Sequence, residues 1–66
     1  MPIVHVHLIE GRSPAQKADL IKEVTEAVER SIGAPKPSIR VLVHDTPGYA
    51  WGVAGEPKVP VPSDGE

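Results

Sequence analysis

Residues 2–33 read PIVHVHLIEGRSPAQKADLIKEVTEAVERSIG, and the spacing of the apolar residues changes once within this stretch. The first eight residues alternate between two faces, which is the pattern of a β-strand. One face carries Val4, Val6 and Leu8, and the other carries Ile3, His5, His7 and Ile9. The second face is too apolar for a free surface and too polar for the core of a monomer. We therefore predict a strand over 2–9 with one unpartnered face, and Pro2 is acceptable at its start.

Residues 13–33 carry the signals of a helix with defined ends. Ser13 and Gln16 have the spacing of a capping box, and Pro14 suits the first helical position. Gly33 suits the left-handed position that follows a helix. The apolar residues between these ends recur at helical spacing, at Leu20, Ile21, Val24, Ala27, Val28 and Ile32. We therefore predict a helix that begins after Ser13 and ends before Gly33.

Residues 38–45, SIRVLVHD, predict a second strand. One face carries Ile39, Val41 and Val43, and the other carries Arg40, Leu42 and His44. A strand–helix–strand order of this length indicates parallel strands joined by a right-handed crossover. Residues 46–48 predict a turn, and residues 51–54 predict a short hairpin arm that Gly55 would end. The predicted fold class is α/β, with a single β-α-β unit and a short C-terminal hairpin.

The chain has 66 residues and no cysteine, so neither disulfides nor thiolate metal sites are available to stabilise it. We predict one domain over 1–56 and a proline-rich tail, extended or disordered, over 57–66. Two parallel strands and one helix cannot cover both faces of a sheet. The face with Ile3 and Ile9 therefore predicts an oligomer, which also offsets the small core of so short a chain.

The composition argues against several classes of partner. The net charge is −2, which does not favour electrostatic binding of nucleic acid or of an anionic membrane. No apolar run approaches the roughly 20 residues of a membrane span, and no signal-peptide pattern precedes the first strand, so we predict a cytoplasmic protein. His5 and His7 share one strand face, but no third ligand converges on them, and we predict no metal site.

Pro2 is the first candidate for chemistry, since it follows the initiator methionine. Bacterial processing normally removes that methionine ahead of a small residue, which would leave a secondary amine. An ordinary α-amino group has a pKa of about 7.7–8.0, and burial or a nearby cation lowers it. Such an amine can act as a general base or as a nucleophile. From the position alone, a simple strand start is the commoner explanation.

Three further residues are unusual for their places. Arg12 lies just ahead of the predicted helix, where the dipole disfavours cations, so it indicates an anionic ligand or else a solvated turn arginine. Arg40 lies in an apolar strand, where it either faces a cavity or pairs with Glu10 or Asp45 of another subunit. Trp51 is the only tryptophan, and it suits either an apolar wall beside an amine or a subunit interface.

Taken together, PIVHVHLIEGRS, PSIRVLV and WGVAG resemble the 4-oxalocrotonate tautomerase family in residue type and spacing. The resemblance runs in register to about residue 56. It implies a homohexamer, a trimer of dimers, with active sites shared between neighbouring subunits. It also implies a proton transfer within an unsaturated 2-oxo acid, such as 2-hydroxymuconate, without metal or organic cofactor.

The resemblance also implies a role for each candidate residue. Pro2, freed of Met1, would be the general base. Arg12 would bind the distal carboxylate, and Arg40 would bind near the 2-oxo group and stabilise charge on the enol oxygen. Trp51 aligns with an aromatic residue of the family. Ala54 departs from the pattern, because members usually have glycine there.

Two other functions remain open on the same residues. The first is hydration or dehalogenation of an unsaturated acid, but no carboxylate is clearly placed to activate water. The second is a non-catalytic oligomeric binding protein that retains Met1, because Pro2 would then have an amide nitrogen with no basicity. The intact mass separates the last hypothesis from the others, and a substrate panel separates the two enzymes.

Overall fold

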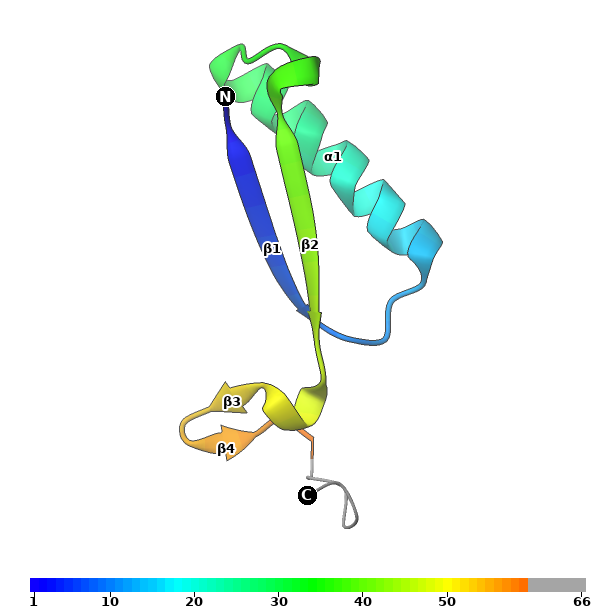
Figure 1. Cartoon of the computed structure of the whole chain (residues 1–66), viewed down its shortest axis with the longest axis vertical. Helices are drawn as coiled ribbons and strands as arrows, with labels where there is room; N and C mark the ends of the chain where they lie inside the picture. The colour runs from blue at the N-terminus through cyan, green and yellow to red at the C-terminus, as the bar shows by residue number, and fades with distance from the viewer. Residues whose placement is uncertain (60–66) are drawn as a thin grey trace.

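The computed structural model describes residues 1–59. Most of the predicted tail, residues 60–66, lies outside the described residues. Strand β1 (Ile3–Ile9) leads into helix α1 (Pro14–Ile32), and the short 3₁₀ helix η1 (Lys36–Ser38) leads into strand β2 (Arg40–Thr46). A second short 3₁₀ helix and two short strands follow; they are η2 (Gly48–Ala50), β3 (Gly52–Val53) and β4 (Glu56–Pro57). Figure 1 shows the helix beside the two long strands and the hairpin beyond their carboxyl ends.

Strands β1 and β2 pair in parallel over their whole length, from Ile3 opposite Arg40 to Ile9 opposite Thr46. This confirms the predicted β-α-β unit. The pairing also brings together the faces that the alternation predicted. Because paired residues share a face, His5 and His7 lie on the same side of the sheet as Leu42 and His44.

The ends of α1 lie where the sequence predicts them. The Ser13 hydroxyl accepts a hydrogen bond from the Gln16 amide at 3.1 Å, and the Gln16 side chain accepts one from the Ser13 amide at 3.0 Å. Gly33 has φ 73°, and its N–H donates to the Glu29 carbonyl at 3.0 Å. No helix within residues 1–59 is long and apolar enough to cross a membrane.

The second strand begins two residues later than predicted and ends one residue later. Ser38 belongs instead to η1, where both its amide and its hydroxyl donate to the Pro35 carbonyl, at 2.9 and 2.7 Å. The Ile39 amide donates to the Lys36 carbonyl at 3.0 Å. These local bonds hold the segment in a turn until Arg40, whose amide is the first to pair with β1.

Helix α1 packs on one face of the sheet and leaves the other open (Figure 1). The covered face holds half-buried residues of both strands: Val4, Val6, Leu8, Val41 and Val43. The open face leaves Ile3 57% exposed and Leu42 41% exposed. Ile39 is the only hydrophobic residue of the described part that is buried, so the single chain has almost no closed core.

The predicted hairpin is present, with Gly52 opposite Pro57 and Val53 opposite Glu56. The first arm ends at Val53, and the two-residue turn of the hairpin consists of Ala54 at φ 53° and Gly55 at φ 85°. Positive φ at both positions is the geometry of a type I′ turn, which suits twisted strands.

Candidate active site

Pro2 and Arg40 lie together at the amino end of the sheet. The Arg40 amide donates a hydrogen bond to the Pro2 carbonyl at 3.0 Å, which fixes the start of the chain against β2. The Arg40 side chain is exposed, and its Nη1 donates to the Pro37 carbonyl at 2.7 Å. Pro2 is half-buried, and Met1, which precedes it in the chain, is 78% exposed. This end of the molecule thus joins the backbones of Arg40 and the residue predicted as the base, and it holds the Arg40 guanidinium at the Pro37 carbonyl.

Arg12 lies at the opposite end of β1, in the turn before α1. Its Nη1 donates to the Ile9 carbonyl at 3.1 Å, and its side chain is otherwise exposed. The capped helix start follows at Ser13, so Arg12 directly precedes the positive end of the helix dipole. Within residues 1–59, neither Arg12 nor Arg40 forms an ion pair. Both remain able to bind an anion.

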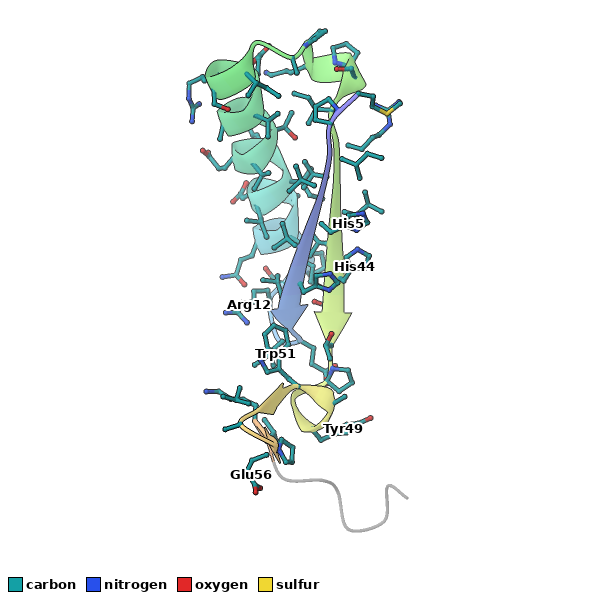
Figure 2. All side chains as sticks on the ribbon, turned by 90° about the vertical axis from the view of Figure 1, so that its left-hand side faces the viewer. His5, Arg12, His44, Tyr49, Trp51 and Glu56 are labelled. Carbon is teal, nitrogen blue, oxygen red and sulfur yellow. The ribbon has the colours of Figure 1, made fainter. Side chains whose placement is uncertain are left out.

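Trp51 lies at the base of the hairpin and is fixed from both sides. Its amide donates to the Gly48 carbonyl at 3.2 Å, and its carbonyl accepts from the Lys58 amide at 2.8 Å. Val59 packs so closely on Gly48 that a Cβ there would come within 2.4 Å of it, so only glycine fits. Figure 2 shows Trp51 and Arg12 both beyond the carboxyl end of β1, away from His5.

The four predicted residues therefore form two groups and not one site. Seven residues of β1 separate Pro2 from the end that carries Arg12, which is roughly 20 Å at 3.3 Å per residue. No pocket lies among the residues that the structure describes. The predicted site residues thus lie at the two ends of the sheet, with Pro2 and Arg40 at one end and Arg12 and Trp51 at the other.

The structure also brings His44 to His5 and His7, which the sequence already places on one strand face. His5 Nδ1 lies 2.8 Å from His44 Nε2, and the rings of His7 and His44 stack with centroids 4.7 Å apart. The alternation and pairing of the two strands place all three side chains on the sheet face that α1 does not cover. The register places His44 opposite His7, and the ring contacts show that His44 touches both other histidines.

Comparison with known proteins identifies the family of the chain. Residues 2–59 match the tautomerase enzyme family. The chain is 48% identical over 56 residues to the 2-hydroxymuconate tautomerase of Stutzerimonas stutzeri, an alignment that covers 85% of this chain and 89% of that protein. A solved 4-oxalocrotonate tautomerase isozyme from Methylibium petroleiphilum is 42% identical, with a TM-score of 0.83, over 86% of this chain and 92% of the other.

The similarity extends to more distant members. A heterohexameric 4-oxalocrotonate tautomerase from Chloroflexus aurantiacus J-10-fl has a TM-score of 0.84 at 28% identity, and the match covers 88% of this chain and 94% of the other. The family resemblance of the sequence is thereby confirmed, together with the β-α-β fold that it implies. The chain belongs to the tautomerase enzyme family, and it is an isomerase.

Proposed function

We propose that copies of this chain join so that Pro2 and Arg40 of one copy meet Arg12 and Trp51 of another. The observation that supports this most directly is the separation of the two groups by the length of β1. A second copy is the simplest source of the missing half, because it carries the same two groups. The family that the chain belongs to includes a hexameric member, and we propose a homohexamer, a trimer of dimers.

In the completed site, Pro2 is the general base once Met1 has been removed. Its secondary amine takes a proton from one carbon of the substrate and returns it to another, so no cofactor is needed. Arg40 lies beside Pro2 and stabilises the negative charge that develops on the enol oxygen. Trp51 limits the access of water to the reacting carbons.

The substrate that fits this site is an unsaturated 2-oxo acid with a second carboxylate, such as 2-hydroxymuconate. Arg12 and Arg40 are both without carboxylate partners in the described chain, and a dicarboxylate would engage both in the assembled site. A 48% identical relative is named for 2-hydroxymuconate. We propose the same substrate class here, and the cytoplasmic location stays a prediction.

A complementation experiment tests the shared site. Pro2→Ala and Arg12→Ala variants are purified separately, each with a large loss of activity, then dissociated together and reassembled. In a random one-to-one mixture, each site takes Pro2 from one copy and Arg12 from another. About a quarter of the sites should then carry both native residues, so part of the lost activity should return. Each variant reassembled alone is the control. Activity that never rises above the controls would mean that each site lies within one chain.

The role of Pro2 is tested by blocking its nitrogen. Intact mass first establishes that Met1 is absent from the active protein. A form with additional residues ahead of Pro2 has an amide there, and it should assemble but lack activity. A panel that includes halogenated and non-halogenated unsaturated acids separates a tautomerase from a hydratase or dehalogenase. Full tautomerase activity in the blocked form would contradict the general-base role.

A further inference from the structure

Two residues that follow the hairpin, Lys58 and Val59, bond to its base. The Lys58 amide donates to the Trp51 carbonyl at 2.8 Å, and the Val59 amide donates to the Gly48 carbonyl at 3.3 Å. Pro57, at the end of β4, has no amide hydrogen, so the two residues after it supply these bonds. We call Lys58 and Val59 the clamp, because they join the end of the hairpin to the segment that leads into it.

Gly48 is the residue on which the clamp closes. It is buried, and its carbonyl accepts hydrogen bonds from the amides of both Trp51 and Val59. A Cβ at Gly48 would overlap the Val59 side chain and would lie 3.7 Å from Cγ2 of Ile9. The Ile9 carbonyl in turn accepts the hydrogen bond from the Arg12 guanidinium. The clamp therefore closes at the end of the sheet that carries Arg12 and Trp51.

Trp51 has little other support within its own segment. Its amide bond to Gly48 closes a single 3₁₀ turn, whose hydrogen-bond geometry is poorer than that of an α-helix. Gly52 follows directly and has no side chain to pack beside the indole. Trp51 is only half-buried, so no closed core surrounds it within residues 1–59. The bond from Lys58 is thus the one that ties Trp51 to a segment beyond its own turn.

We infer that Lys58 and Val59 are positioning residues for Trp51, acting through their backbone amides and through the packing of Val59 on Gly48. The inference rests on the proposed function, in which Trp51 limits the access of water to the substrate. When Trp51 is correctly placed for only a fraction of the time, the apparent substrate affinity falls by that fraction. Loss of the clamp should therefore raise KM more than it lowers kcat. Monocarboxylates and dicarboxylates should be affected alike, because Trp51 does not bind the distal carboxylate.

Lys58→Pro in the full chain tests this inference. Proline removes the amide hydrogen that bonds to Trp51 and puts a ring carbon in its place. Lys58→Ala is the matched control, since it removes the same side chain and keeps the amide. We expect Lys58→Pro to raise KM at least about threefold on both kinds of substrate, with kcat changed less than about twofold. Lys58→Ala should show neither change, and sedimentation establishes that the proteins are compared in the same oligomeric state.

The position of Trp51 can be measured without substrate. It is the only tryptophan of the chain, so tryptophan fluorescence reports on this side chain alone. In Lys58→Pro, the anisotropy decay of Trp51 should gain a faster local component, and acrylamide should quench its emission more strongly. A double-mutant cycle with Trp51→Ala then separates action through the indole from a general effect. In that background, Lys58→Pro should not raise KM further, because the residue that the clamp positions is gone.

The outcomes separate this inference from the proposed function. Unchanged Trp51 fluorescence in folded Lys58→Pro overturns the inference and leaves the proposed function intact. An effect on KM that persists in full in the Trp51→Ala background also overturns it. Altered fluorescence, together with a KM that Trp51→Ala does not change, supports the clamp and removes Trp51 from the proposed site. If Lys58→Pro does not fold by circular dichroism, Val59→Ala trims the packing on Gly48 and is measured in the same way, with the same outcomes.

Discussion

The two faces of the β1–β2 sheet differ in whether helix α1 covers them. One face is packed against α1, and its residues at Val4, Val6 and Val43 are half-buried. Within residues 1–59 no element covers the other face, which carries Leu42 and three histidines. Alternate residues of the same two strands therefore differ in whether α1 covers them, and the oligomer predicted from the sequence would use the uncovered set.

The largest expected effect comes from placing a charge on each face in turn. Val43→Asp puts a carboxylate on the half-buried face under α1 and should lower the free energy of unfolding by about 1–3 kcal/mol, because a partly desolvated charge without a partner is destabilising. Leu42→Asp, on the adjacent residue, should keep the helical circular dichroism signal but block assembly in sedimentation. Equal loss of helix in both variants would mean that the two faces contribute alike to the fold.

The features that the sequence predicts correctly are those that depend on neighbours along the chain. The capping box of Ser13 and Gln16, the end at Gly33 and the alternation of each strand all involve residues within a few positions. The separation of Arg12 from Pro2 follows from the length of β1 alone, whereas the contacts of His44 with His5 and His7 depend on how two distant strands pair. Alternation predicts which face a residue occupies, but not which residue of the other strand lies beside it.

The late start of β2 has a different cause. The alternation of Ser38 and Ile39 continues that of the strand, so spacing alone includes them. The Ser38 hydroxyl instead bonds to the Pro35 carbonyl, and this competes with strand pairing. The candidate residues stand out by their places in the sequence, but the family resemblance supplies the roles of Pro2, Arg12 and Arg40, which stay predictions.

The second largest effect is expected from substituting the arginines at the two ends of the sheet. Arg40→Ala should lower kcat about 10²–10³-fold, because it removes a donor to the oxygen on which charge develops. Arg12→Ala should chiefly raise KM for dicarboxylates and change monocarboxylate turnover little, since its proposed partner is the distal carboxylate. Steady-state kinetics on a matched pair of substrates measures both. Equal, small effects on both substrates would contradict the division of roles.

A smaller effect is expected in the hairpin, which lies beyond both faces. Ala54 has φ 53°, a left-handed conformation that costs a residue with a Cβ about 1 kcal/mol. Ala54→Gly should therefore raise the free energy of unfolding by up to about 1 kcal/mol. Gly55→Ala, at φ 85° in the same turn, should lower it by a similar amount or more. Denaturant titration at fixed protein concentration measures both, and a loss of stability in Ala54→Gly would contradict the strain.

The smallest effect is expected from the one ion pair at the edge of the covered face, between Lys17 of α1 and Asp45 of β2. Its side chains are 29% and 35% exposed, so water and salt screen the attraction, and the pair should contribute no more than about 1 kcal/mol. Lys17→Met keeps the apolar stem that packs on the sheet and removes only the charge. We expect little change in unfolding free energy at low salt and none at high salt. A loss above about 2 kcal/mol would show that this charge pair, and not apolar packing, holds the helix to the covered face.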